Sequence, residues 1–324
     1  IDGQGSYSRS VRERSSLGKG YFAGAFARIV NLNMRGDGIN EGNSILPRTL
    51  SLKDAAGRSI NWFDGDNYSL QNTTEEFAVY QTDLASGRVD VARAFGGRFS
   101  VKTGVSFNRM DKDDIRPNTA YTFVGRDRIT AVSAYDLIDD SIGVKMNGNP
   151  IRWISPVKAY KLFVDHPDWF TLNSSAVQNA VTSSKRMLED ISAAYLRFDL
   201  KLLQNRANLT GGLRYEKTAL DGWSLLKDSF AIYRRDSAGN LLRDNAGALV
   251  RKTTDATELI KLQFIERGSH EKRDYAGLYP SLNFNYAFSD NLVARAAYAR
   301  TLGRPDVSYV VAGVTLPVPT DTNP

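Results

Sequence analysis

The feature that most constrains the fold of this chain is a two-residue alternation of apolar and polar side chains, in paired segments joined by very short links. Near the C-terminus one such segment alternates up to Ser289-Asp290-Asn291, and a second alternates after it. Its apolar residues are Leu282, Phe284, Tyr286 and Phe288, followed by Leu292, Ala294, Ala296 and Tyr298. A period of two is typical of a strand with one buried face. A three-residue turn sets Phe288 opposite Leu292 and brings both apolar sets onto one face.

Two further pairs follow the same rule. The segment 97–108 alternates, and a loop at Ala94-Phe95-Gly96 sets Val91 opposite Phe99. In the third pair the apolar positions change from even numbers (196–202) to odd numbers (209–215). Such a change demands an even-numbered loop, which Gln204-Asn205 supplies. Each pair is therefore predicted to be a hairpin with one apolar face.

A fourth pair, at about 5–14 and 20–31, alternates less regularly and brings the number of expected strands to eight. The connections between hairpins are long, at about 32–75, 109–188 and 217–275. Short turns at one end and long loops at the other are typical of a bacterial outer-membrane barrel, whose strands of about ten residues span a thin apolar band. The sequence thus predicts an all-β fold: an antiparallel transmembrane β-barrel portion with short periplasmic turns and long extracellular loops.

Composition is compatible with this prediction without requiring it. Hydrophobic residues make up 42% and charged residues 24%, as in a soluble globular protein. No run of eighteen apolar residues occurs, so a transmembrane helix is excluded. A barrel strand directs only every second side chain to lipid, which gives it the mean hydropathy of a soluble protein. A soluble all-β binding module stays open as an alternative.

Local structure is also expected inside the long loops. Ser155-Pro156 followed by an apolar pattern predicts a capped helix that stops before Pro167. Three stretches share an Asp with Gly three positions later, which is a turn signature. These stretches, 53–60, 235–241 and 243–249, are predicted to be small hairpins.

Two stretches resemble barrel hairpins of the TonB-dependent receptor family. The first runs Tyr279-Pro280-Ser281-Leu282-Asn283 and continues through Arg295-Ala296-Ala297-Tyr298-Ala299-Arg300-Thr301 to Arg304-Pro305. It is similar to the family's Pro-Ser-Leu-Asn strand, its Arg-Ala-Ala-Tyr-x-Arg-Thr strand and a terminal Arg-Pro. The second, 193–200 followed by 211–218, is similar to the preceding hairpin of the same barrels.

The resemblance implies a barrel of twenty-two strands around an N-terminal plug, with uptake energised by the TonB-ExbB-ExbD complex through that plug. No plug or TonB box is recognisable here, eight strands are too few, and the chain does not end on an aromatic residue. We therefore expect residues 1–324 to be a fragment, the middle part of a receptor barrel in contact with lipid in the bacterial cell outer membrane. A passive porin-type channel, whose lumen holds no plug, is the alternative.

Ligand contact is expected in the long loops. The resemblance implies a siderophore, cobalamin or an oligosaccharide as ligand, and we expect an oligosaccharide or a metal–siderophore complex. Sugar rings stack on aromatic faces, whereas iron–siderophore anions seek basic groups. The loop Trp residues and the absence of a clustered basic patch favour the oligosaccharide. The expected ligand-binding residues are Trp153, Trp169, Trp223, Tyr233, Arg152, Arg234 and Arg235. The same aromatics could instead pack the loops or anchor at the membrane interface. Arg197, Arg214 and Arg295 are expected to face the lumen, where pairing with Asp199 or Glu216 is the simpler role.

Other chemistry finds little support in the sequence. The two histidines, His166 and His270, lie far apart without partners at the spacing of a metal or catalytic site, and cysteine is absent. We expect no metal, no cofactor and no enzyme. The net charge of +6 is spread along the chain rather than clustered, so nucleic acid is not expected as a partner.

Overall fold

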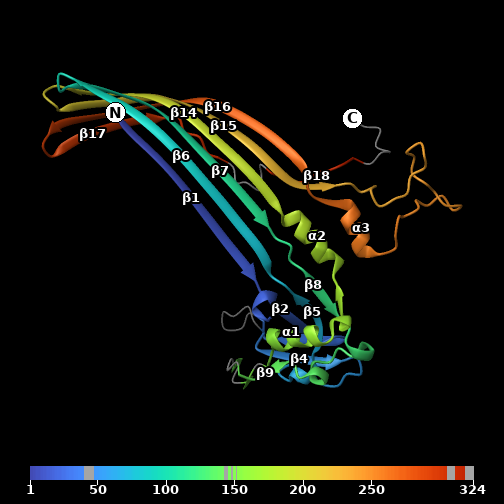
Figure 1. Ribbon diagram of the computed structural model, residues 1–324. Coiled ribbons are helices and arrows are strands. Elements are labelled where there is room, and N and C mark those ends of the chain that lie inside the picture. The colour runs from blue at the N-terminus through green and yellow to red at the C-terminus, as the bar shows by residue number, and fades with distance from the viewer. Residues whose placement is uncertain (40–46, 142–144, 147–148, 151, 305–310, 318–324) are drawn as a thin grey trace.

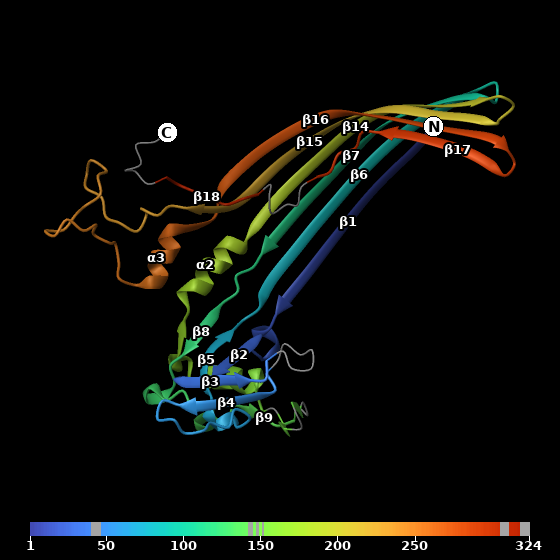
Figure 2. The ribbon, with the colours of Figure 1, turned by 180° about the vertical axis from the view of Figure 1, so that it is seen from behind.

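The structure is a computed structural model that describes residues 1–39, 47–141, 145–146, 149–150, 152–304 and 311–317. Its main element is a curved antiparallel sheet with the strand order β1-β6-β7-β14-β15-β16-β17 (Figure 1). The strands are β1 (Asp2–Ser15), β6 (Phe77–Phe95), β7 (Phe99–Ile115), β14 (Lys185–Leu202), β15 (Ala207–Lys227), β16 (Phe264–Ser289) and β17 (Leu292–Ala299). Short turns join them at one end and long connections at the other (Figure 2), which confirms the predicted all-β class.

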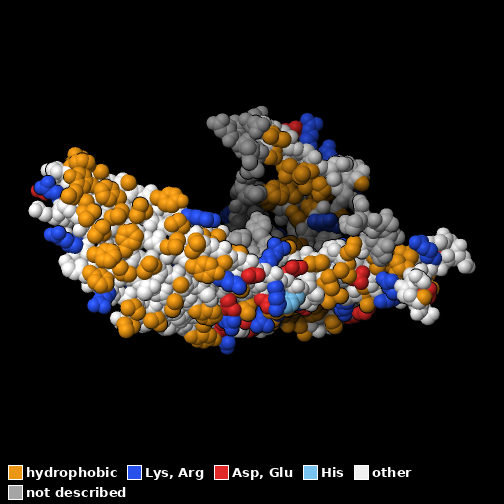
Figure 3. Space-filling view, turned by 90° about the horizontal axis from the view of Figure 1, so that it is seen from above, with side chains coloured by type: hydrophobic (Ala, Val, Ile, Leu, Met, Phe, Trp, Pro, Cys, Tyr) orange, Lys and Arg blue, Asp and Glu red, His pale blue; other side chains and the backbone are white. Residues whose placement is uncertain are grey.

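The two faces of this sheet differ in chemistry because successive side chains of a strand point to opposite faces. Leu200 is paired with Phe99 on one side and Leu209 on the other, and Leu209 with Phe284, so these apolar residues share one face. Figure 3 shows apolar side chains crowded over the end of the sheet that carries the turns. We call this the lipid face. The opposite face, here called the lumen face, carries mainly polar side chains.

Ion pairs begin where the apolar part of the lipid face ends. Tyr7, Phe107 and Tyr215 each stand two residues before a cation, and at the other edge the Phe95 and Phe99 ring centroids lie 5.8 Å apart. On the side of Tyr7, Phe107 and Tyr215 that faces the long connections, the lipid face carries ion pairs, and we call this part the charged zone. Its pairs are Arg9–Asp83, Arg109–Asp190, Arg186–Asp111 and Lys217–Asp274. Phe99 to Phe107 span roughly 26 Å of strand, or about 20 Å across a bilayer at a tilt of about 40°. This apolar height is close to the band of about 25 Å, with aromatic edges, that an outer-membrane barrel presents to lipid.

The strands run further than the alternation predicted. The long connections are 16–76, 116–184 and 228–263, so the expected loops at 109–188 and 217–275 are wrong at their edges. Beyond the apolar band the lipid face carries charges, and the apolar period therefore disappears although the backbone pairing continues. Strand length outside a membrane is for this reason hard to see in a hydrophobic pattern.

The register of the last hairpin follows the prediction with one local change. Leu282 lies opposite Tyr298 and Tyr286 opposite Ala294, as expected. A bulge near the turn places Ser289, rather than Phe288, opposite Leu292. Since the bulge is confined to the turn, both apolar sets still share the lipid face.

The other two turns keep the predicted faces but not the predicted residues. The pairing of Val91 with Phe99 is wrong, because Phe95 lies opposite Phe99 and the turn is Gly96-Gly97-Arg98. Both glycines have positive φ, at 59° and 74°, which moves the turn two residues along the chain. The β14–β15 loop has four residues, 203–206, and not two, which preserves the even count that the parity demands.

The first two long connections fold together into one lobe at the loop end of the sheet. Its four-stranded sheet has the order β13-β8-β5-β2. These strands are β2 (Gly24–Arg28), β5 (Ser69–Thr74), β8 (Ala120–Phe123) and β13 (Phe170–Leu172). The expected hairpin at 5–14 and 20–31 is therefore wrong: β1 pairs with β6, and β2 pairs with β5. Apolar side chains of 20–31 pack in the core of the lobe and not on a barrel face. Their spacing therefore does not follow the two-residue period of a barrel strand.

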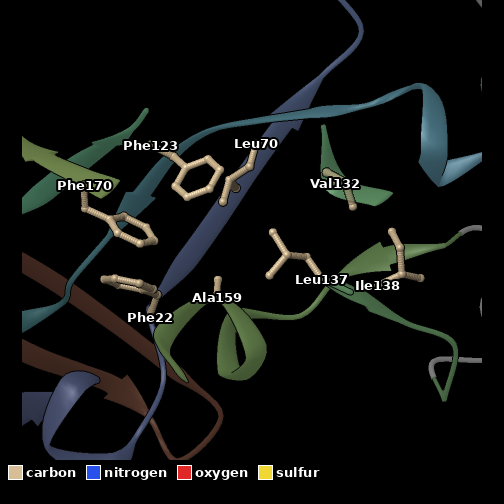
Figure 4. Close-up of a cluster of buried hydrophobic side chains, with 8 residues drawn as sticks. All are labelled: Phe22, Leu70, Phe123, Val132, Leu137, Ile138, Ala159 and Phe170. Carbon is tan, nitrogen blue, oxygen red and sulfur yellow. The ribbon is translucent and has the colours of Figure 1, made fainter. Parts of the chain in front are cut away.

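A buried apolar core holds the lobe together (Figure 4). Its members are Phe22, Leu70, Phe123, Val132, Leu137, Ile138, Ala159 and Phe170. Helix α1 (Pro156–Asp165) packs on this core and confirms the predicted helix, with the Ser155 side chain accepting from the Lys158 amide at 3.3 Å. The remaining helices are α2 (Ser174–Ser183) and α3 (Ala256–Gln263), with short 3-10 turns at Leu17–Lys19, Gly65–Asn67, Arg126–Arg128, Val132–Tyr135 and Pro167–Trp169. Within the described part of the chain, no helix has the length and apolar character to cross a membrane.

Small two-stranded units complete the fold. They are β3 (Leu32–Asp37) with β4 (Thr49–Asp54), β9 (Ile138–Asp139) with β12 (Trp153–Ile154), and β10 (Lys145–Met146) with β11 (Asn149–Pro150). The three predicted loop hairpins are confirmed by the bridges Lys53–Ser59, Arg235–Leu241 and Arg243–Leu249. A ninth strand, which the sequence allows from Ser308 to Val314, lies partly outside the described residues, which resume at Val311. The pairing described there is β18 (Val314–Thr315), parallel to β15.

Candidate functional site

The lumen face contains a groove of about 680 Å³ across β14 to β17. The three arginines predicted to face the lumen, Arg197, Arg214 and Arg295, all line it. They share it with Tyr195 and Tyr279, because alternate residues of paired strands fall on one face. The structure therefore brings these three arginines together. Their part in ligand passage stays a prediction.

Two of these arginines are neutralised by carboxylates of their own strands. Arg197 pairs with Asp199 at 2.6 Å, and Arg214 pairs with Glu216 at 2.7 Å. These are the carboxylates that the sequence suggested. Within the described residues, Arg295 has neither an ion pair nor a hydrogen bond from its side chain. The groove therefore offers one uncompensated cation among hydroxyl and amide groups.

A buried carboxylate beside the groove was not anticipated. Asp90 is only 2% exposed and accepts a hydrogen bond of 2.8 Å from the Tyr195 hydroxyl. Arg88 and Lys102 each lie 3.1 Å from its second oxygen. Tyr195 reaches Asp90 across Gly104, where a Cβ would come within 2.2 Å of the carboxylate. The glycine inside an otherwise regular strand was the available signal, because such a glycine marks a close approach.

The chain after β17 returns across the lumen face. Arg304 pairs with Glu216 and lies 3.8 Å from Glu189. Val311 is 1% exposed and packs against Met187 and Leu220. Arg304 and Val311 thus cover the lumen face near the long connections, whereas the groove lies nearer the turns.

Arg152 and Trp153, two of the expected ligand-binding residues, lie on the lobe. Arg152 holds Asp140 at 3.0 Å and lies 3.9 Å from both Asp64 and Asp66. The hydrogen bond to Asp140 raises the pKa of Arg152 further above its ordinary value. Because Asp64 and Asp66 come from the first connection and Asp140 from the second, Arg152 ties the two connections together.

The aromatic surface of the lobe is larger than expected. Trp153 is 45% exposed beside Arg152. Trp62 and Phe63, which sequence reasoning passed over, have ring centroids 4.0 Å apart and precede Asp64 directly. Trp169 is different: its ring lies flat on His166 at 3.8 Å and packs against the lobe core. Trp153 and Trp62 are therefore the better placed for contact with a ligand.

Trp223 was expected in a loop, and this is wrong because β15 extends to Lys227. Its ring lies flat on His270 at 4.6 Å, with the Arg186 guanidinium 5.5 Å from its centroid. His270 pairs with Asp221. Trp223 thus belongs to the charged zone of the lipid face. In the part of the chain that the structure describes, no three His, Cys, Asp or Glu side chains are grouped to hold a metal.

The last expected residues, Tyr233, Arg234 and Arg235, lie in the connection between β15 and β16. The expected site residues therefore occupy three places: the lobe, the lipid face and this connection. Arg234 and Arg235 are exposed, while Tyr233 is half-buried beside Phe230. None of the expected ligand-binding residues lines the groove on the lumen face.

The curved sheet combines an apolar lipid face, aromatic edges, a charged zone and a polar lumen face. Residues 5–324 match the protein family described as TonB dependent receptor-like, beta-barrel. A search among curated proteins found no match. The family match covers the lobe and the β15–β16 connection as well as the sheet. The chain belongs to the TonB-dependent receptor-like β-barrel family, whose members are transporters and receptors of the bacterial outer membrane.

Proposed function

We propose that this chain supplies barrel wall and extracellular surface to a transporter that takes up an oligosaccharide. The energy would come from TonB with ExbB and ExbD, acting through a plug inside the lumen. Family membership favours this energised receptor over a passive porin or a soluble binding module.

One observation supports the choice of ligand above the others. The lobe presents Trp153 and the Trp62–Phe63 pair next to Arg152 and its three carboxylates. Sugar rings stack on aromatic faces, and their hydroxyls both donate to carboxylates and accept from guanidinium groups. A siderophore anion would need a free cation there, whereas Arg152 is compensated. The lobe thus suits a polyhydroxylated ligand better than an anionic iron complex.

Uptake by whole cells tests this proposal. Cells with the native receptor should accumulate a fluorescent oligosaccharide, and the accumulation should stop when a protonophore removes the energy source. Trp153→Ala combined with Trp62→Ala should reduce uptake about tenfold, the effect of losing roughly two aromatic contacts. Val164→Ala, at a 58% exposed residue of α1, is the matched control and should leave uptake unchanged. Uptake that does not depend on the receptor for any oligosaccharide tested would refute the proposal.

A further inference from the structure

The connection between β15 and β16 contains a compact three-pointed unit, residues 232–252, which we call the arginine arm. Three residues eight apart in the sequence form a closed ring of backbone hydrogen bonds. Leu242 N donates to Arg234 O at 2.9 Å, Val250 N to Leu242 O at 3.0 Å, and Arg234 N to Val250 O at 2.9 Å. Each of the three carbonyls therefore accepts from the next member, and the backbone at the centre of the arm is fixed.

Two of the three projections of the arm are the hairpins 235–241 and 243–249, and in each hairpin a carboxylate accepts hydrogen bonds from backbone amides of the same turn. Asp236 accepts from the amides of Ala238 and Asn240, and Asp244 accepts in the same way, all at 2.9 Å. The backbone N–H of Asn240 holds the pKa of Asp236 below its ordinary value. Gly239 and its counterpart Gly247 take the left-handed conformation that the turn needs, at φ 88° and 82°. Both carboxylates of the arm thus bind backbone amides of their own hairpins.

The cations of the arm are placed differently. Arg235, Arg243 and Arg251 each follow a member of the central ring and are exposed. Arg235 Nη1 donates to Gly239 O at 2.8 Å, and Arg243 makes the equivalent contact. A guanidinium carries five N–H groups, so most of each fork faces solvent.

Charge is concentrated in this arm. Its 21 residues hold five cations, which include Arg234 and Lys252, and two carboxylates. The excess of three is half of the chain's net charge of +6, although the cations of the whole chain looked evenly spread. The positive charge is thus concentrated in one continuous segment of the sequence, and the expected even spread of charge is wrong there.

The three repeated arginines share one face of the arm. The bridges are Tyr233–Arg251, Arg235–Leu241 and Arg243–Leu249, and directly bridged residues of an antiparallel pair point to the same side. Residues two apart along a strand also share a side. Guanidinium groups therefore alternate with Tyr and Leu side chains around the ring. Such a surface suits a ligand that carries anionic groups at intervals along its length.

The arm lies too far from the membrane for lipid headgroups. Strand β15 continues from Tyr215, at the edge of the apolar band, to Lys227 before the connection begins. These twelve residues raise the arm about 30 Å above the band at a tilt of about 40°. Figure 1 shows the arm's connection at the same end of the sheet as the lobe. The arm is therefore placed to contact an anionic ligand outside the cell and not the headgroups of the membrane.

We propose that the arginine arm binds the carboxylate groups of an acidic oligosaccharide, with Arg235, Arg243 and Arg251 as the recognition residues. This rests on the proposed function, in that the cargo is an oligosaccharide. An Arg fork can pair with a carboxylate through two parallel N–H groups, and the eight-residue repeat presents the same fork several times. Repeated forks suit a saccharide with a carboxylate on each unit.

Binding to the purified, micelle-embedded receptor tests the arm. The probes are hexagalacturonate, neutral maltohexaose and vesicles with anionic phospholipid. Replacing Arg235, Arg243 and Arg251 by Gln should weaken hexagalacturonate binding about tenfold at low salt and less at high salt. Lys53→Gln is the matched control, because Lys53 holds the equivalent position in the third hairpin of this type, where Asp54 accepts from Ala56 and Arg58.

Each outcome separates the arm from the proposed function. Unchanged hexagalacturonate binding in the triple variant, or an equal loss in Lys53→Gln, overturns the inference about the arm. Loss of vesicle binding alone also overturns it, because the arm would then contact lipid. If maltohexaose is taken up by cells and hexagalacturonate is not bound, the proposed function stands and the arm proposal fails. If no saccharide binds or enters cells, the proposed function itself fails.

Discussion

Phe22 decides whether the two connections stay folded as one lobe. Its side chain has no exposed surface, and its ring centroid lies 5.5 Å from that of Phe163 and 5.8 Å from that of Tyr160. Truncating a buried Phe to Ala costs about 3–5 kcal/mol from lost transfer energy and the cavity left behind. A small core contributes a net stability of about the same size. Phe22→Ala should therefore open the lobe in a large fraction of molecules at 25 °C.

Hydrogen exchange on the receptor in micelles measures this opening. Amides of β5 and β8 should lose protection in Phe22→Ala, while those of β7 in the sheet keep theirs, because the sheet is paired independently of the lobe core. Phe26→Ala is the matched control: Phe26 lies in β2 but is 55% exposed. Native protection of β5 in Phe22→Ala, or equal loss in Phe26→Ala, would refute the account of the lobe.

Two further predictions concern the sheet and the loop hairpins. Gly104→Ala should lower the urea concentration at which the sheet unfolds, because a Cβ there meets Asp90 and the Val89 carbonyl. Gly87→Ala should not lower it, because a Cβ there has no neighbour within 4 Å. Equal unfolding midpoints for the two variants would contradict the close approach at Gly104. Asp236 has a pKa lowered chiefly by the backbone N–H of Asn240, so its hairpin gains stability above the unfolded pKa of about 3.9 and loses it as pH falls through the folded value. Carbon-13 titration of labelled Asp should show this midpoint below about 3.9, and a midpoint at or above that value would rule the contact out.

The part of the fold that could be predicted from the sequence is the part where one face meets lipid. Alternation and turn length together fix the register of a hairpin, and the 281–299 pair was predicted correctly except at its bulge. The turn after β6 was missed because Gly96 and Gly97 both tolerate positive φ, so two placements were open. The even shift left every side chain on its predicted face.

The lobe could not be predicted, because its core is assembled from distant pieces. Phe22, Leu70, Phe123 and Phe170 stand far apart in the sequence and share no local period. Leu70, Phe123 and Phe170 were expected in or next to loops, and Phe22 was expected in a barrel strand, because nothing local shows that the two connections fold together. Helix α1 was predicted because its cap and its proline are local signals.

The site residues divide on similar grounds. Arg197, Arg214 and Arg295 followed from strand parity, which places them on one face. Trp223 was misplaced because the strand continues after its apolar pattern ends. The contact between Tyr195 and Asp90 was missed because it crosses an intervening strand, β7, and strand order cannot be read from one hairpin at a time.

The most direct test of the barrel-wall account is a nitroxide scan along β7 in the native outer membrane. The chain has no cysteine, so each introduced Cys is labelled alone. Lipid-dissolved oxygen should accelerate the spin relaxation of labels at Phe99, Val101 and Val105. It should not accelerate the relaxation of labels at Ser100 and Lys102, so the oxygen accessibility has a period of two. An oxygen accessibility without that period, or one that is high at Ser100 and Lys102 instead, would contradict the assignment of the lipid and lumen faces and with it the membrane barrel.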